Sequence, residues 1–216
     1  MPKAKTRAKT PKALSTYRKK RDFSRTPEPS GEPEQQPVES SAAATPAIFV
    51  IHKHDASRLH YDLRLQIGAT MPSWAVPKGP SLNPANKRLA VHVEDHPLDY
   101  ADFEGAIPQG EYGGGTVMVW DRGTVTFTTE GKTPQQSLEA GLLEFELHGE
   151  KLRGNWALVH TKMGGSEKNW LLIKRKDDFA RAEGDILAEQ PNSAKTGRSL
   201  EQIAAEDAAP HSQSPL

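Results

Sequence analysis

The chain has 216 residues, 35% of them hydrophobic and 26% charged, and its 28 basic side chains balance 28 acidic ones. This length suits one domain with extensions. The absence of cysteine excludes disulfides, thiolate metal sites and a cysteine nucleophile. No apolar stretch approaches the ~18 residues of a membrane span, and the basic N-terminus lacks the apolar core of a secretory signal. We therefore expect a cytoplasmic protein with no membrane partner.

Charge is distributed unevenly along the chain. Residues 1–25 carry ten Lys or Arg against one acid, whereas residues 183–216 carry six acids against two bases. Such ends are typical of solvated, disordered segments, and a basic arm also suits a nucleic-acid partner. We predict a basic arm with a linker over residues 1–46, a folded domain over 47–181 and a disordered, polar to acidic tail over 182–216.

The basic arm contains one segment with signals of local structure. Residues 14–23 are predicted to form a short helix capped by Ser15 or Thr16. Two prolines, Pro27 and Pro29, then favour an extended chain. Residues 30–46 are rich in Gly, Pro, Gln, Glu, Ser and Ala, which indicates a flexible linker.

The central part of the chain is predicted to be mainly β. Runs of β-forming residues between glycine-rich or asparagine-rich turns predict strands at residues 48–51, 59–67, 73–76, 87–94, 116–120, 123–128, 142–147, 154–160 and 169–174. Short helices are predicted within 95–107, 134–140 and 199–205. About eight short strands with little helix indicate a β-sandwich or a small barrel. We predict a closed or nearly closed barrel, because closure removes open sheet edges.

One predicted strand has a polar side with a distinctive composition. His60, Asp62 and Arg64 alternate with leucine and tyrosine, and His54 precedes them with the same parity. Because successive side chains of a strand point to opposite faces, these polar groups share one face. Two histidines and an aspartate suit a divalent metal, and an arginine beside them can grip a phosphate with two parallel hydrogen bonds. The same alternation is also typical of an edge strand whose polar side faces water.

A second predicted strand has polar residues in the same alternation. Arg88 and Glu94 share one parity over residues 87–94, and His96 continues it. If the two strands face one cavity, the combined set holds metal ligands, two arginines for phosphate and a Glu–His pair for proton transfer.

The remaining histidines, Lys78 and the tryptophans are interpreted separately from the two polar strand faces. His92 has the parity of the site, but a solvated strand position explains it more simply. Lys78 lies in a loop from which it can contact a substrate. Histidines without motif support are interpreted as surface or packing residues, and the four tryptophans as core residues: His52, His148, His160, Trp74, Trp120, Trp156 and Trp170.

Several long motifs can be compared with known families. They are His54-Asp-Ala-Ser-Arg-Leu-His60-Tyr-Asp62-Leu-Arg64-Leu, Ser73-Trp-Ala-Val-Pro-Lys78-Gly-Pro, Arg88-Leu-Ala-Val-His-Val-Glu94-Asp-His96-Pro-Leu-Asp-Tyr100, Gly110-Glu-Tyr-Gly, Val119-Trp-Asp-Arg-Gly and Asn169-Trp-Leu-Leu-Ile-Lys174. Together they resemble the 3′-phosphoesterase domain of bacterial DNA ligase D, in a stand-alone form. Residues 17–29 resemble the N-terminal segment of the same family.

The resemblance implies a fold and an activity. The family fold is a small β-barrel, in agreement with the strand count. The family activity depends on Mn²⁺, with other divalent metals left open, and acts on DNA primer-template 3′ ends during non-homologous end joining. It removes a terminal ribonucleoside, leaving a 3′-phosphate, and then removes that phosphate to leave a 3′-OH. We therefore expect a cytoplasmic, nucleoid-associated enzyme whose partner is a separate DNA ligase or end-joining factor.

The resemblance also implies roles for individual residues. The metal ligands are His54, His60 and Asp62. The residues that hold the scissile phosphate are Arg64 and His96. The residues that support the site, or that match N-terminal residues needed for activity, are Arg88, Glu94, Tyr100, Arg21, Asp22 and Glu28.

Two other functions are compatible with parts of this pattern. The His60-x-Asp62 motif also occurs in non-haem Fe(II) oxygenases, with His96 or His160 as the distal histidine. However, no arginine follows either histidine by about ten residues to bind an oxoacid, and Arg64 and Arg88 favour phosphate. The second alternative is a non-catalytic module that binds DNA ends and docks through the basic arm.

Overall fold

The computed structural model describes residues 14–32 and 46–208. Within these ranges the strands are β1 (Ile48–Asp55), β2 (Leu59–Leu65), β3 (Ser73–Val76), β4 (Arg88–His92), β5 (Gly105–Ile107), β6 (Gly115–Phe127), β7 (Leu142–Gly149), β8 (Arg153–His160) and β9 (Asn169–Lys174). The helices are α1 (Ser15–Lys19), η2 (Leu98–Asp102), α2 (Pro134–Glu139), η3 (Met163–Gly165), α3 (Ile186–Glu189) and α4 (Leu200–Ala208). No described helix is both long and apolar enough to span a bilayer.

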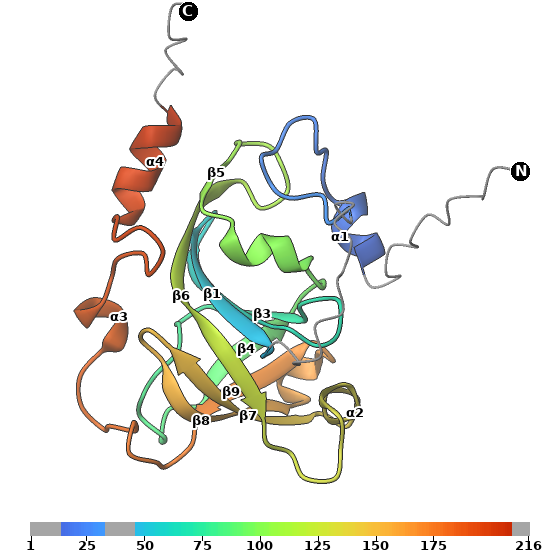
Figure 1. The fold of residues 1–216 in the computed structure, drawn as a ribbon, viewed down its shortest axis with the longest axis vertical. Helices are drawn as coiled ribbons and strands as arrows, with labels where there is room; N and C mark the ends of the chain where they lie inside the picture. Colours follow the sequence, from blue (N-terminus) through green and yellow to red (C-terminus); the bar gives the residue numbers. More distant parts are fainter. Residues whose placement is uncertain (1–13, 33–45, 209–216) are drawn as a thin grey trace, which may run out of the picture.

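The strands of the described chain form one antiparallel sheet that closes on itself (Figure 1). Their order is β1-β2-β3-β4-β9-β8-β7-β6, and the pairing of β1 with β6 completes a ring of eight strands. β5 adds to the outside of this ring by pairing with β6. The predicted barrel is therefore confirmed, and closure leaves no long open edge in the ring.

The barrel interior is a packed apolar core. Trp74, Trp120 and Trp156 are the largest fully buried side chains, and Phe49 and Leu63 lie in the same cluster. Burial of this much aromatic and aliphatic surface is the main driving force for folding. The prediction that the tryptophans belong to the core is confirmed.

The polar residues of β1 and β2 therefore point to the outer face of the barrel. Residues directly opposite each other on paired strands share a face, and His54 lies opposite His60, while His52 lies opposite Asp62. Arg64 continues this face two residues further along β2. The predicted parity of this strand is correct, and its polar face lies on the outside of the barrel wall.

The predicted orientation of β4 is wrong for its first residues. Ala75 pairs with Asp62 on one side and with Val91 on the other, so Val91 shares the outer face with Asp62. Arg88 has the opposite parity, as does Ala90, which is fully buried in the core. Leu89, between these two residues, is 39% exposed. The alternation is equally regular on both sides, so only strand pairing decides which side faces the core.

The strand β6 is continuous where the sequence predicts two strands around a turn at residues 121–123. The Asp121 carboxylate is buried and accepts backbone hydrogen bonds from Arg122, Lys151 and Leu152. Gly123 brings the β6 backbone close to β7, where an added Cβ would lie 2.2 Å from the carbonyl oxygen of His148. These long-range contacts hold the segment extended, and a bulge between Ile51 and His52 adjusts the register.

The C-terminal segment differs from the predicted disordered tail. Residues 182–208 belong to the described fold, and Figure 1 shows α4 alongside β5 and β6. Ile186, Leu200 and Ile203 are buried in the main core cluster. Three apolar side chains within a polar composition are enough to dock the segment, because only one face of a short helix needs to be apolar.

The N-terminal segment packs against the barrel, and its helix begins differently from the prediction. The N-cap of α1 is Leu14, and no side chain caps the helix, so the predicted caps at Ser15 and Thr16 are wrong. Tyr17 is fully buried and donates a 2.6 Å hydrogen bond to the carbonyl of Pro29. Contacts with the rest of the protein therefore stabilise this short helix in place of a cap. Predictions for residues 1–13 and 33–45 lie outside the described residues.

Candidate functional site

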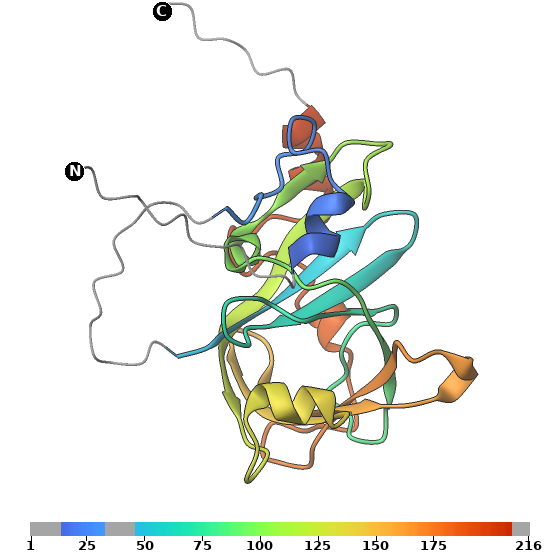
Figure 2. The same ribbon diagram turned by 90° about the vertical axis from the view of Figure 1, so that its right-hand side faces the viewer.

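A cavity of about 250 Å³ lies on the outer face of the barrel wall. Its lining includes both histidines, the aspartate and the arginine of the β1–β2 face, together with residues from the N-terminal segment and three loops. Figure 2 shows α1 in front of β1 and β2. The residues that line the cavity are Arg21, His54, Ala56, His60, Asp62, Arg64, Ala75, Val93, Glu94, His96, Tyr100, Ile107, Tyr112 and Gly113.

The predicted metal ligands converge. One ligand atom from each of His54, His60 and Asp62 lies within 4.8 Å of the others, and within the described chain they form the group suited to a metal ion. His54 Nδ1 is 3.9 Å from Asp62 Oδ2, and His60 Nε2 is 3.5 Å from Asp62 Oδ1. Two imidazole nitrogens and a carboxylate suit first-row divalent metals.

Hydrogen bonds on the far sides of the two rings set their tautomers. His54 Nε2 lies 2.8 Å from the carbonyl oxygen of Gly113, and His60 Nδ1 lies 2.8 Å from that of Arg58. Because a carbonyl oxygen only accepts, these ring nitrogens carry the hydrogens. Burial lowers the pKa of His54 despite the opposing charge of Asp62. The lone pairs of His54 Nδ1 and His60 Nε2 are thus left for a metal.

Arg64 is held by three side chains. Nη2 donates to Asp62 Oδ2 at 2.8 Å, Nη1 contacts His96 Nδ1 at 2.9 Å, and Nε donates to His52 Nδ1 at 3.2 Å. Its guanidinium carbon also lies 4.9 Å from the ring centroid of Tyr100. The guanidinium has five N–H groups, so these contacts leave donors for a ligand in the cavity.

His96 lies between two guanidinium groups. Arg64 approaches its Nδ1, and Arg21 Nη2 lies 3.4 Å from its Nε2. Burial, reinforced by the charge of Arg64 and then of Arg21, lowers the pKa of His96 well below its ordinary value. His96 Nδ1 also lies 2.9 Å from the carbonyl oxygen of Glu94, which only accepts, so Nδ1 carries the hydrogen and the lone pair of the neutral ring is at Nε2, facing Arg21. In this arrangement His96 contacts both guanidinium groups and is not itself a cation.

The N-terminal segment contributes Arg21 to the same cluster. Arg21 Nε donates to Glu28 Oε1 at 2.8 Å, and Nη1 lies 3.3 Å from Glu94 Oε1. All three side chains are 5% exposed or less. A buried ion pair depends on well-placed partners to offset desolvation. Arg21, Glu28, Glu94 and His96 thus lie together in the fold, although 66 residues separate Glu28 from Glu94 in the sequence.

Tyr100 packs behind the cluster and Tyr112 lies at its rim. The Tyr100 ring contacts the rings of His52 and His96 at centroid distances of 5.4 and 4.8 Å. Burial raises the pKa of Tyr100 well above its ordinary value, so the phenol stays neutral. Tyr112 is 46% exposed, and Lys20 donates hydrogen bonds to both its hydroxyl and Glu94.

Three of the predicted residues lie apart from the cavity. Asp22 forms a local turn in which its carboxylate accepts from the backbone and hydroxyl of Ser24. Arg88 is on the inward-facing parity of β4 and does not line the cavity. His160, one of the two candidate distal histidines of the oxygenase interpretation, does not line the cavity, and its Nε2 bonds the carbonyl of Glu167; the other candidate, His96, does line it.

His52 belongs to the site although the sequence offers little reason to select it. It is fully buried, and its Nδ1 accepts from Arg64 Nε. Burial, and then the charge of Arg64, lowers its pKa well below the ordinary value. It shares the strand parity of His54 and lies opposite Asp62, and this parity is the one signal that identifies it.

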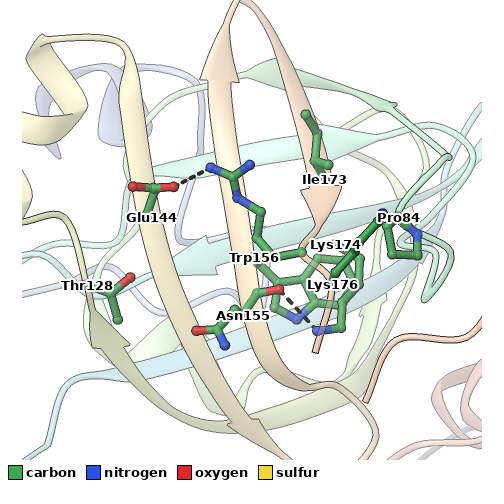
Figure 3. A pocket seen from close by; sticks show the side chains of 9 residues that line it. Pro84, Thr128, Glu144, Asn155, Trp156, Ile173, Lys174 and Lys176 are labelled. Carbon is green, nitrogen blue, oxygen red and sulfur yellow. Dashed lines mark hydrogen bonds and ion pairs between the residues drawn. The ribbon is translucent and has the colours of Figure 1, made fainter. Parts of the chain in front are cut away.

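A larger hollow of about 630 Å³ lies on the β7–β9 side of the barrel (Figure 3). Three of its four charged side chains, Glu144, Lys174 and Arg175, are paired. Arg175 bonds Glu144, and Lys174 Nζ donates to the carbonyl of Asn155 at 3.1 Å. No histidine lines it. The smaller cavity, where lone pairs and a guanidinium converge, is therefore the better candidate.

Comparison with known proteins decides the family. The family model of the DNA ligase D 3′-phosphoesterase domain matches residues 52–160, which include the His–His–Asp group, Arg64 and His96. The chain belongs to this family. The chain is also similar to longer proteins named multifunctional non-homologous end joining protein LigD.

These relatives cover most of this chain. LigD of Pseudomonas aeruginosa is 53% identical over 191 residues, which is 88% of this chain and 22% of the relative. LigD of Mycolicibacterium smegmatis is 44% identical over 188 residues, or 84% of this chain and 23% of the relative. The Mycobacterium tuberculosis protein is 42% identical over 177 residues. The chain thus spans less than a quarter of the length of these relatives.

Proposed function

We propose that this protein is a divalent-metal-dependent phosphoesterase that heals DNA 3′ ends, with Mn²⁺ as its metal. It removes a 3′-terminal ribonucleoside from a primer strand and then removes the remaining 3′-phosphate, leaving a 3′-OH. The observation that carries this proposal is the convergence of two imidazole lone pairs and a carboxylate beside a buried arginine. Family membership supports the reaction class.

The donor set fits such a metal. His54, His60 and Asp62 would hold it, since their hydrogen-bonded partners already leave the required atoms facing one another. A bound metal ion would neutralise phosphate charge and lower the pKa of a water molecule. Closed thiolate sites are excluded by the lack of cysteine, which leaves a harder N/O site suited to Mn²⁺ and its neighbours.

Arg64 would bind the phosphate and stabilise the charge that develops on its oxygens. Preorganised donors of this kind are typically worth about 10²–10³ in rate. Its position is set before substrate arrives, because Asp62, His52 and His96 each hold one edge of the guanidinium. His96 and the Arg21–Glu28–Glu94 group would then orient the phosphate, while Tyr100 limits water behind Arg64.

The substrate and partners are proposed on the same basis. A primer-template with a 3′-terminal ribonucleotide or 3′-phosphate presents the phosphate ester that this site suits. A 3′-OH end is what a DNA ligase needs, so a ligase or another end-joining factor would act next. We further propose that Asp22 and Arg88 contribute through substrate contacts or local structure, since neither lines the cavity. The proposed location of the protein is the nucleoid.

The test uses a labelled primer-template with one 3′-terminal ribonucleotide, incubated with Mn²⁺. We expect conversion to a 3′-phosphate end and then to a 3′-OH end, with both steps lost in EDTA and in His60→Ala. A product that stops at the 3′-phosphate would remove the phosphatase step from the proposal. Intact but bound substrate would instead support a DNA-end-binding module.

A further inference from the structure

A second buried carboxylate lies outside the cavity and accepts four hydrogen bonds. Glu104 stands between η2 and β5, and its side chain is 2% exposed. It accepts from Val119 N at 3.0 Å and from Arg198 Nη2 at 3.0 Å. The hydroxyls of Ser193 and Thr196 each lie 2.5 Å from it. Three of these four partners come from the C-terminal segment, more than 85 residues later in the chain.

The same C-terminal segment also bonds the backbone of Asp102, just before Glu104, and that of Val119 on β6. We call residues 190–198 the strap. Lys195 Nζ donates to the carbonyl of Asp102 at 2.6 Å, and Ala194 N donates to the carbonyl of Val119 at 2.9 Å. At the other end of the strap, Trp120 Nε1 donates to the carbonyl of Gln190 at 2.7 Å. The strap therefore ties the end of η2 to β6.

The two elements that the strap joins both support Arg64. Val119 of β6 lies opposite His52, the residue that accepts from Arg64 Nε. η2 carries Tyr100, whose ring contacts both His52 and the Arg64 guanidinium. Phe103, one residue before Glu104, packs on Tyr100 with ring centroids 5.2 Å apart. A shift of η2 relative to β6 would thus change the surroundings of the guanidinium from two sides.

We propose that Glu104 is a positioning residue for the phosphate-binding arginine, and that the strap is an integral part of the phosphoesterase unit. The effect on catalysis rests on the proposed function, whereas the effect on Arg64 does not. Glu104 acts through η2 and β6, since its carboxylate is bonded to Val119, Ser193, Thr196 and Arg198. The strap provides an arginine and two hydroxyls, which neutralise and solvate this charge in place of water.

The geometry makes an amide a poor replacement for the carboxylate. Val119 N and the Arg198 guanidinium only donate, so the nitrogen of Glu104→Gln would face a donor. A buried group left unsatisfied in this way loses its partner and destabilises the local arrangement. Arg198→Met removes the cation from the other side of the same interaction. Arg181→Met is the matched control, because it removes an exposed arginine–glutamate pair with Glu189 in the same C-terminal region.

The experiment has two readouts on the full chain. The first is the NMR signal of the Arg64 Nε–H group, which is hydrogen-bonded to His52, recorded without substrate. We expect this signal to shift or broaden in Glu104→Gln and Arg198→Met, which we call the strap variants because both break the contact between Glu104 and the strap. It should stay unchanged in Arg181→Met. An unchanged signal in both strap variants would overturn the proposal, whether or not the protein is an active enzyme.

The second readout is kinetic. We expect kcat for phosphate release to fall about tenfold in both strap variants, because small misplacements of a catalytic group are costly. Mn²⁺ affinity should stay within twofold of wild type, since His54, His60 and Asp62 do not contact the strap. If kcat falls only in proportion to the folded fraction, or if Arg181→Met loses as much kcat, the positioning role of Glu104 is contradicted. A wild-type protein that releases no phosphate would reject the proposed function and leave the NMR result to decide the role of Glu104.

Discussion

The two faces of the β1–β2 hairpin meet opposite requirements. The inner face holds Phe49, Ile51 and Leu63 in a dry core. The outer face holds His54, His60 and Asp62, whose free lone pairs point into a cavity. Side chains one residue apart thus differ in role: one side stabilises the barrel, and the other side keeps polar groups poised for a ligand. The comparison predicts that stability and activity can be altered separately within one strand.

The largest expected effect comes from removing a metal ligand on the outer face. His60→Ala should abolish metal binding and both activities, because the remaining two ligands hold a divalent ion weakly. Its side chain is 23% exposed, so the free energy of unfolding should change by less than ~1 kcal/mol. Calorimetric titration with Mn²⁺ measures the first effect and thermal unfolding the second. His148→Ala, on an exposed strand position, is the control; turnover in His60→Ala equal to that control would remove the metal assignment.

The second prediction tests whether Arg64 acts through its positive charge alone or also through the planar geometry of its guanidinium. Arg64→Lys keeps a positive charge but loses the planar fork that bonds Asp62, His52 and His96. We expect kcat to fall by about 10²–10³, measured as phosphate release from a 3′-phosphorylated primer. The exposed Arg122→Lys should be unaffected. A near-normal rate in Arg64→Lys would show that a point charge suffices and that the fork has no part in the reaction.

A substitution on the inner face of the same strand should reduce stability and leave activity nearly unchanged. Leu63→Ala leaves a cavity in the core, where Leu63 is 1% exposed. We expect a loss of about 2–5 kcal/mol in the free energy of unfolding, measured by urea denaturation, with kcat per folded molecule within a few-fold of wild type. A selective loss of kcat without destabilisation would break the division between the two faces.

The smallest of these effects concerns the N-terminal segment. Glu28→Gln keeps the shape of the side chain but removes the charge that pairs with Arg21 at 2.8 Å. We expect kcat to fall about tenfold because Arg21 loses its orientation against Glu94 and His96. Steady-state kinetics beside Glu32→Gln, an exposed acid of the same segment, provides the comparison. Equal rates in the two variants would mean that Arg21 is held well enough without Glu28.

Local patterns explain why much of the site could be predicted. The alternation in β2 places His60, Asp62 and Arg64 on one face in any sheet, and their chemistry points to a metal and a phosphate. The turns and β-forming runs are also local, and they were sufficient to predict a β-sandwich or a small barrel. The motifs then linked residues that are far apart in sequence, such as Glu28 and Glu94, through resemblance to a family.

Tertiary structure decided what local patterns leave open. Alternation does not say which side of β4 faces the core, and pairing through Ala75 placed Arg88 on the inner side. Composition could not reveal that three apolar residues dock the C-terminal segment, or that Ser193 and Arg198 reach Glu104. The sequence by itself determined the local strand faces and the ligand types, because these depend on backbone period and side-chain chemistry. Only the folded chain decided which face is buried and which distant partners hold Arg64, because those depend on contacts between residues far apart in sequence.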